Sequence, residues 1–344
     1  MISVNSNAGS GLWDNPDMSS DSAPSNESLT AALAALRRGE AIGLPTETVY
    51  GLAGDAGNDA AVRNIFALKG RPADHPLIVH IADASQLDRW AKDIPENARR
   101  LADAFWPGPL TLILKKRDDV ANIVTGGQDS IGLRCPAHPV ALALLRAFGG
   151  GLAAPSANRF GHVSPTSAQH VRDEFGAAVP IVLDGGDCDV GIESTIVDLS
   201  GVAPRILRPG RISRAELETV IGPVAEGATG DSPRASGLLE KHYAPRTATQ
   251  LLTRTQAIAA AREQSALGKR VVVLAIASLP DDFDGIALPA DPAAYAHGLY
   301  AALRELDGQH AHLIVIERPP ENRAWIAVLD RLRRSAAGTD DDAT

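Results

Sequence analysis

Cysteine, basic charge and long apolar runs are all in short supply in this chain. Its 344 residues include two cysteines, Cys135 and Cys188, which exclude a disulfide framework and cannot by themselves build a zinc site. The longest apolar run, Val271 to Ala277, falls far short of the ~18 residues that a membrane-spanning helix needs. No basic residue precedes Arg37 and the N-terminus has no apolar core, so we expect no secretory signal and a cytoplasmic location.

The shortage of positive charge bears on possible partners. Lys and Arg number 33 against 42 Asp and Glu, and the net charge of -9 disfavours a protein that coats nucleic acid, although a local basic patch could still bind a polyanion. The sequences G-x-x-x-x-G-K-[ST], G-x-G-x-x-G, H-E-x-x-H and G-x-S-x-G are also absent. The P-loop, dinucleotide-binding, zinc-protease and α/β-hydrolase classes therefore lose their usual support.

The chain length predicts two domains, at roughly 150 residues for each. Residues 1–25 are rich in Ser, Asn, Asp and Gly and are expected to form a disordered tail. Residues 26–222 alternate helical and strand patterns, and residues 223–246 form a linker dominated by Gly, Pro, Ser and Ala. Residues 247–336 contain a βαβα unit that predicts a small parallel sheet. The fold class is therefore α/β.

Local patterns place the individual elements. Helices are expected from residue 29 to Gly39 and over 58–70, 139–148, 166–175, 292–306 and 322–334, with two short ones through Trp90 and Phe105. The capping-box pairs Thr166 with Gln169 and Ser213 with Glu216 predict two helix starts. Strands are expected over 41–44, 77–81, 110–116, 131–135, 151–156, 181–186, 195–200, 205–210, 270–276 and 312–317.

Two basic residues follow one predicted helix in the segment LKGRPADHPL. Gly70 suits the end of that helix and Pro72 stops it, so Lys69 and Arg71 would sit on a rigid turn shortly before His75. A planar guanidinium and a point-charge ammonium together suit a polyphosphate. The alternative is a basic helix end that complements the helix dipole, which is the commoner role of a lone K-x-R.

Further polar groups lie at predicted strand ends. The sequence PSAN at 155–158 supplies a hydroxyl and an amide where ligands bind in open α/β sheets, although it could be a simple turn. Arg134 lies in an apolar strand and needs an anionic partner or ligand. His80 in LIVHI is more often a satisfied core histidine than a ligand. Glu193-Ser194-Thr195 and Arg208 mark two more strand ends. Together these clusters indicate one ligand site.

Quoted in order, the clusters are LPTETVYGLAGDA, LKGRPADHPLIVHI, FWPGPLTLIL, IGLRCPAHP, APSANRFGHVSPT, ESTIVDL and ILRPGRIS. Across residues 28–214 they resemble the YrdC-like family of L-threonylcarbamoyladenylate synthases. The segment SPRASGLLEKHYAPRT and the downstream βαβα unit resemble the longer form of that family, in which a linker carrying H-Y-x-P lies over the active site. The resemblance implies a YrdC-like twisted open mixed sheet with helices, plus a small Rossmann-like C-terminal α/β domain. Family members often have Asn at the position of His75.

The resemblance implies condensation of L-threonine, bicarbonate and ATP into threonylcarbamoyl-AMP and pyrophosphate, with Mg²⁺ accompanying ATP and no protein metal ligands assigned. The product would pass to the tRNA threonylcarbamoyl transferase machinery, for threonylcarbamoyladenosine at position 37 of tRNA. By carry-over, the catalytic residues would be Lys69, Arg71, Ser156 and Asn158. The ATP-binding residues would be Arg71, His75, Ser130, Ser156, Ser164, Arg208 and Tyr243. The threonine-binding residues would be Thr48, His80, Arg134, Ala154 and Ser194.

Two other functions stay open at this point. One is a module that binds double-stranded RNA or tRNA, which the acidic balance and the lack of interleaved basic and aromatic residues make secondary. The other is a structural scaffold whose C-terminal domain binds a partner. The linker contains Leu238, Leu239, His242 and Tyr243, which a pure spacer would not need, so we expect it to fold over the ATP site as a lid. The alternative is that Leu238 and Leu239 only pack one domain against the other.

Overall fold

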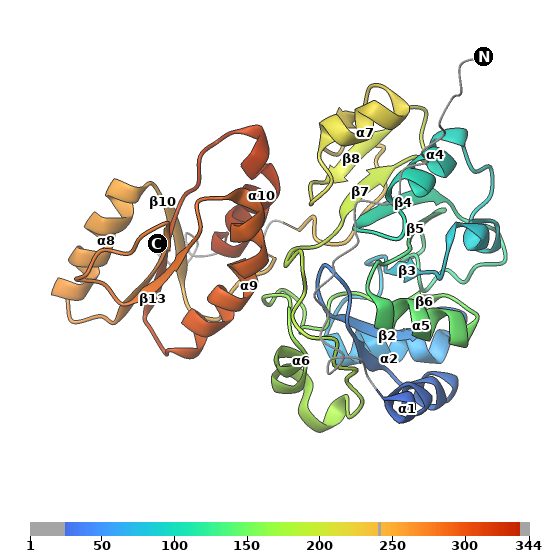
Figure 1. The fold of residues 1–344 in the computed structure, drawn as a ribbon, viewed down its shortest axis with the longest axis horizontal. Coiled ribbons are helices and arrows are strands. Elements are labelled where there is room, and N and C mark those ends of the chain that lie inside the picture. Colours follow the sequence, from blue (N-terminus) through green and yellow to red (C-terminus); the bar gives the residue numbers. More distant parts are fainter. Residues whose placement is uncertain (1–24, 240–241, 338–344) are drawn as a thin grey trace, which may run out of the picture.

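The computed structural model describes residues 25–239 and 242–337, so the tail expected over 1–25 lies outside the described residues except for Ser25. Figure 1 shows a larger N-terminal α/β body beside a smaller C-terminal one. Within these ranges no helix combines the length and the apolar character that crossing a membrane requires.

A mixed sheet of nine strands organises the larger domain, in the order β1-β2-β6-β3-β5-β4-β7-β8-β9. The pairs β3/β5, β4/β7 and β8/β9 are parallel and the other neighbours are antiparallel. This is the mixed α/β sheet that the sequence predicted. The strands are β1 (Ile42–Leu44), β2 (Gly51–Asp55), β3 (Ile78–His80), β4 (Leu110–Lys115), β5 (Ser130–Arg134), β6 (Leu152–Ala153), β7 (Thr195–Asp198), β8 (Arg205–Arg208) and β9 (Ala225–Glu226).

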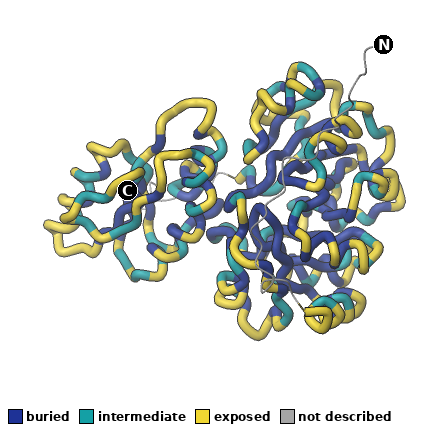
Figure 2. Tube along the Cα trace, viewed as in Figure 1, coloured by how far each residue is buried: buried dark blue, intermediate teal, exposed yellow. Residues whose placement is uncertain are grey.

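Helices cover this sheet and bury two apolar clusters. The larger cluster joins α2, α4, α6 and α7 to the middle strands, and the smaller one joins α1 and α5 to β1. Figure 2 shows the sheet as the buried centre of the domain. The helices are α1 (Asn26–Arg37), α2 (Asp59–Lys69), α3 (Leu87–Trp90), α4 (Glu96–Phe105), α5 (Pro139–Phe148), α6 (Ala168–Phe175) and α7 (Arg214–Ile221), with short 3₁₀ turns at Ala84–Gln86 and Gly176–Ala178.

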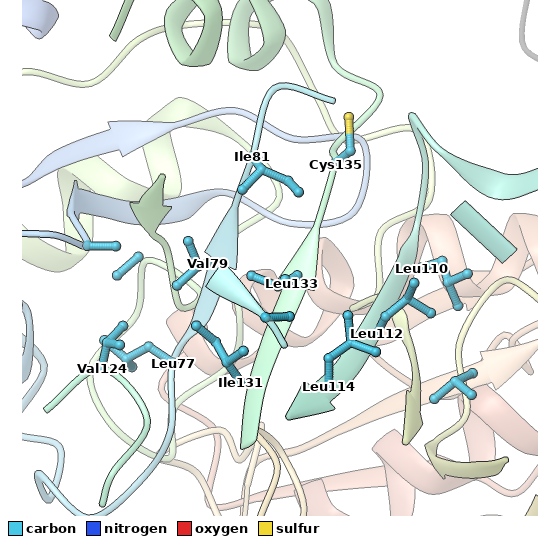
Figure 3. Close-up of a cluster of buried hydrophobic side chains, with 14 of the residues drawn as sticks. Leu77, Val79, Ile81, Leu110, Leu112, Leu114, Val124, Ile131, Leu133 and Cys135 are labelled. Carbon is cyan, nitrogen blue, oxygen red and sulfur yellow. The ribbon is translucent and has the colours of Figure 1, made fainter. Parts of the chain in front are cut away.

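Strand alternation decides which side chains enter the larger cluster. Figure 3 shows Val79, Ile131, Leu133, Leu112 and Leu114 of three adjacent strands packed together. Successive side chains of a strand point to opposite faces of the sheet. The residues between these apolar ones therefore project to the other face, and these include His80 and Arg134.

The structure corrects three local expectations. Ser167, not Thr166, caps α6, because its side chain accepts the backbone N–H of His170, whereas the predicted capping box of Ser213 and Glu216 is present at α7. Residues 181–186 are not a strand and make only an isolated bridge between Val182 and Gly43. Strand β9 pairs with β8, so the larger domain's sheet continues into the segment interpreted as linker.

The smaller domain contains an all-parallel sheet in the order β10-β13-β11-β12, which confirms the expected parallel arrangement. Alternate residues of β11 and β13 pack against α9 and α10 on one face and against α8 on the other. Elements β10, α8 and β12 were not predicted. The bounds are β10 (Thr249–Leu252), α8 (Arg254–Ala266), β11 (Val271–Ile276), β12 (Gly285–Leu288), α9 (Pro292–Gly308), β13 (Leu313–Glu317) and α10 (Ile326–Ala336), preceded by a 3₁₀ turn at Arg323–Trp325.

The face of the small domain that carries α9 and α10 packs on the large domain (Figure 1). The apolar cluster of α9 and α10 includes Val49, Val163 and Ile192 of the larger domain. Beside it, Glu174 of α6 accepts a hydrogen bond from Arg304 of α9 at 3.2 Å and lies 3.1 Å from the His162 ring. The two domains thus share one apolar core flanked by charge pairs.

Glu174 makes this interface sensitive to acid. Burial alone would raise the pKa of Glu174, but His162, the backbone N–H of Arg159 and Arg304 lower it to about 2. A depressed carboxyl pKa contributes stability above the unfolded pKa, and that stability is lost as the pH falls toward the folded value. When the pH falls from 5 to 3, the free energy of unfolding should decrease in both proteins. We expect the decrease to be about 1 kcal/mol smaller in Glu174→Gln than in the wild type.

Denaturant unfolding at several pH values measures this difference. The matched control is Glu321→Gln, which removes an exposed carboxylate beside Arg333. Parallel pH curves for Glu174→Gln and the wild type would refute the assignment.

Candidate functional site

The side chains of the central strands alternate between the two faces of the sheet, and polar residues lie on the face opposite the apolar cluster. His80 and Arg134 end the parallel strands β3 and β5 and are paired in register, while Ser130 begins β5 on the same face. Thr111 of β4 follows the same alternation. The sheet therefore brings together polar residues that are widely separated in the sequence.

A pocket of about 520 Å³, partly open to solvent, lies on this face. Strand ends, the loop after β6 and the segment between the domains all contribute to its wall. Its lining includes the sequence-predicted Thr48, Arg71, His80, Arg134, Ala154, Ser156, Ser194, Arg208 and Tyr243. Also in the wall, and not predicted as site residues, are Thr46, Val49, Gly51, Ile78, Pro155, Glu193, Ser236, Gly237 and His242.

Arg134 forms an ion pair with Glu47, which is the anionic partner expected for an arginine in an apolar strand. Its Nη2 lies 2.7 Å from Glu47 Oε1, and its Nη1 donates to Thr48 Oγ1 at 2.8 Å. Both charged side chains are almost fully buried. Glu47, in the turn before Thr48, was not assigned to the site from the sequence. Arg134 is therefore held by the protein itself at the edge of the pocket.

His80 lies beside Arg134 and is buried. Burial and the neighbouring guanidinium lower the pKa of His80 to about 3, so the ring is neutral at physiological pH. Its Nδ1 has no hydrogen-bond partner within the described part of the chain. A neutral ring with an unpartnered nitrogen in a pocket wall suits a polar, uncharged group of a ligand.

Arg71 and Arg208 add two more guanidinium groups to the wall. Arg71 Nη2 donates to the carbonyl of Pro76 at 3.0 Å and to Ser236 Oγ at 3.2 Å. Arg208 donates to the carbonyl and the hydroxyl of Ser194, both at 3.1 Å. Burial lowers the pKa of Arg71 to about 10, which leaves it charged at neutral pH. Three arginines from separate elements make this a site for anionic groups.

Lys69 is the last residue of α2 and lies behind the wall of the pocket. Gly70 does end α2 in the left-handed conformation, as expected, yet Lys69 is only 2% exposed. Its Nζ donates to the carbonyls of Ser156 at 2.5 Å and Asn158 at 2.6 Å. The Asn158 side chain in turn donates to the carbonyls of Arg159 and His162. In this structure Lys69 and Asn158 hold the loop that follows β6.

The remaining predicted residues surround the pocket. Ser130 lines an adjoining cavity of about 280 Å³. Ser164 donates to Glu193 Oε1 at 2.6 Å. The His75 ring packs edge-on against Phe160, with centroids 5.4 Å apart. These three residues lie outside the pocket lining itself.

Among the described residues, Glu193 is the one carboxylate in the lining. Burial would raise the pKa of Glu193, but Arg331, Arg208 and the hydroxyl of Ser164 lower it to about 2. Arg331 and Tyr300, which belong to the small domain, contact its Oε2 at 2.8 and 2.9 Å. The sequence marked Glu193 only as part of a strand end, because nothing local indicates a partner so far along the chain.

The described part of the interdomain segment closes one side of the pocket. Ser236, Gly237, His242 and Tyr243 all line it, and Tyr243 is 1% exposed. Leu238 packs against an apolar cluster of the large domain's sheet, whereas Leu239 is 39% exposed. The segment therefore contacts the site as well as joining the two domains.

If this segment must open to admit substrate, ATP and threonine will protect it. We expect limited proteolysis between Gly227 and Gly237 to slow severalfold when both ligands are present, because exposed loop tips are cleaved through open states. Cleavage in the exposed β11–β12 connection around Asp281 and Asp282 provides an internal control. Equal cleavage with and without ligands would contradict a lid and leave the segment as a connection between the domains.

Fold and pocket together define a two-domain α/β protein with an arginine-lined pocket beside its interdomain segment. Residues 34–210 match a family model described as telomere recombination, and residues 212–337 match one described as the threonylcarbamoyl-AMP synthase C-terminal domain. The chain belongs to the threonylcarbamoyl-AMP synthase family, which confirms the resemblance noted in the sequence.

Similar proteins cover nearly the whole chain. The threonylcarbamoyl-AMP synthase of Pyrococcus abyssi is 40% identical over 316 residues, which is 88% of this chain and 92% of that relative. The Bacillus subtilis threonylcarbamoyl-AMP synthase is 38% identical over 336 residues, 94% of this chain and 96% of the relative. A crystal structure of P. abyssi Sua5 complexed with L-threonine superposes with a TM-score of 0.85 at 38% identity, covering 90% of this chain and 94% of that chain. The two-domain YrdC-like architecture is thereby confirmed.

Proposed function

We propose that this protein condenses L-threonine, bicarbonate and ATP into threonylcarbamoyl-AMP and pyrophosphate. The observation that carries the proposal is the convergence of Arg71, Arg134 and Arg208 on one pocket in a chain whose relatives are named threonylcarbamoyl-AMP synthases. Threonine, ATP and the carbamate all carry negative groups, and a cationic wall can hold them together.

The chemistry needs positioning and charge stabilisation. The threonine amine combines with bicarbonate to give a carbamate and water. A carbamate oxygen then attacks the α-phosphorus of ATP, and the bond to the β-phosphate oxygen breaks so that pyrophosphate leaves with the electron pair. Phosphoryl chemistry of this kind depends on aligned reactants and fixed cations. The arginines of the wall can supply those cations without a covalent nucleophile.

We assign the roles as the family resemblance implies. Threonine would contact Thr48, His80, Arg134, Ala154 and Ser194. ATP would contact Arg71, His75, Ser130, Ser156, Ser164, Arg208 and Tyr243. Arg71 and Ser156 would act at the reacting phosphate, while the contacts of Lys69 and Asn158 favour a role in holding the Ser156 loop.

Mg²⁺ would enter bound to the triphosphate. Residues 25–239 and 242–337 hold no group of three or more His, Cys, Asp or Glu side chains able to bind a metal. Glu193, the carboxylate of the pocket lining, is committed to Arg331, Tyr300 and Ser164. We therefore assign no ligands of the ion among the described residues, and no reaction step is routed through it.

Transfer of the product to the tRNA threonylcarbamoyl transferase machinery, a weak tRNA contact and a cytoplasmic location stay predictions. The proposal itself is tested by incubating the protein with ATP, threonine and ¹³C-bicarbonate. We expect pyrophosphate release that requires all three reactants and a mass-spectrometric adenylate that carries the label. Pyrophosphate release without threonine, or an unlabelled product, would contradict the proposed reaction.

A further inference from the structure

One arginine of the small domain reaches into the wall of the pocket. Arg331 of α10 is completely buried at the domain interface. Its Nε donates to Glu193 Oε2 at 2.8 Å, and its Nη1 donates to the carbonyl of Pro209 at 3.0 Å. Asp330, its chain neighbour, accepts a further hydrogen bond at 2.7 Å. The planar guanidinium thus holds two points of the large domain at once.

Those two points flank a pair of pocket residues. Glu193 directly precedes Ser194, and Pro209 directly follows Arg208. Ser194 and Arg208 both line the pocket, and Arg208 donates to the Ser194 carbonyl and hydroxyl. A shift of Glu193 or Pro209 would therefore move two groups that face the substrates.

The small domain supplies a second group to the same carboxylate. Tyr300 of α9 donates its hydroxyl to Glu193 Oε2 at 2.9 Å. From the large domain, Ser164 Oγ donates to Oε1 at 2.6 Å, and no other side chain in the described part of that domain donates a hydrogen bond to this carboxylate. Arg331 also lies 5.4 Å from the ring centroid of Tyr243, which is in the pocket lining. Glu193 is thus oriented mainly from the other domain.

We propose that Arg331, supported by Tyr300, is a positioning residue through which the C-terminal domain sets the geometry of Ser194 and Arg208. The inference rests on the proposed function and deepens it, because it makes the small domain part of substrate binding. A purely structural role would lower the amount of folded protein, whereas a positioning role changes the affinity of the folded protein for its substrates.

The experiment compares Arg331→Lys, Tyr300→Phe and the control His297→Ala in the full-length protein. His297 also joins the domains, through Asp189, but neither residue lines the pocket. We expect Arg331→Lys to raise KM for ATP and for threonine about tenfold, since an ammonium cannot span Glu193 and Pro209. Tyr300→Phe keeps the ring and removes one hydrogen bond, so a rise of about threefold is expected. His297→Ala should change either KM less than about twofold.

Calorimetric titration measures the Kd for ATP and does not require catalysis. We expect the affinity for ATP to weaken in the same order of variants. Unchanged KM and Kd values in both variants, with only a lower melting temperature, would overturn the inference and leave Arg331 as a domain latch. If Arg331→Lys does not fold, Tyr300→Phe carries the test. A wild type that binds ATP but forms no adenylate would refute the proposed function, while the Kd series would still decide the inference.

Discussion

Replacing Arg71 with alanine is expected to lower kcat/KM for ATP by about 10²-fold, since one fixed donor to a charge that develops in the reaction typically contributes that much. Arg71 is 8% exposed and lines the pocket. Its Nε has no hydrogen-bond partner among the described residues. A buried cationic donor without a protein partner is suited to a phosphate oxygen, and the variant would lose it.

The fold should survive this change. The Pro76 carbonyl that accepts from Arg71 also accepts from Ser236 Oγ at 3.0 Å, so it keeps a donor. The control is Arg63→Ala on α2, the helix that precedes Arg71, which removes an exposed ion pair with Asp59 and should shift stability by no more than about 0.5 kcal/mol. Pyrophosphate release at subsaturating ATP, together with thermal unfolding, measures both effects. Wild-type release by Arg71→Ala would remove Arg71 from the ATP site.

The site was predictable from sequence where a local pattern carried the information. In IVH and SIGLR a polar residue directly follows an apolar one at the end of the strand. Because successive side chains of a strand point to opposite faces, His80 and Arg134 lie on the face opposite the core. The same segments do not reveal distant partners. Glu47 lies 87 residues before Arg134, and Lys69 lies 87 residues before Ser156, whose carbonyl helps to bury it. A K-G-R sequence after a helix is usually solvated, so the burial of Lys69 could not be inferred.

The small domain shows the same limit for the fold. Its long strands β11 and β13 are continuous apolar runs and were predicted, whereas β12 is a short GIAL segment. Helix α8 buries only the small side chains of Ala257 and Ala261, so its apolar period is weak. Arg331 lies in the charged run LDRLRR, where an exposed side chain is the usual expectation. Its burial depends on a domain interface that no local pattern encodes.

The second large effect is expected at Arg134. Arg134→Lys should raise KM for threonine at least about tenfold, because an ammonium cannot reproduce bidentate pairing with a carboxylate. The side chain already pairs with Glu47, donates to Thr48 and reaches the Gly108 carbonyl at 3.3 Å. The lysine variant should therefore also lose stability, and a rise in KM alone does not separate the two roles.

Glu47→Gln separates the structural role of Arg134 from its role in threonine binding. It breaks the ion pair with Arg134 by changing Glu47, which does not line the pocket. Removing one partner of a buried pair, as Glu47→Gln does, costs about 3–5 kcal/mol. The lysine of Arg134→Lys keeps the charge but cannot keep all the contacts of the guanidinium, so both variants should melt at lower temperature. With the Glu47 charge gone, the Arg134 guanidinium remains and is no longer neutralised by a neighbouring carboxylate. KM for threonine in Glu47→Gln should then stay equal to the wild-type value or fall, while in Arg134→Lys it rises. Measurements of initial rate against threonine concentration, made well below both melting temperatures, give the comparison. Equal destabilisation of the two variants with an unchanged KM for threonine would make Arg134 a structural partner of Glu47 and remove it from the threonine site.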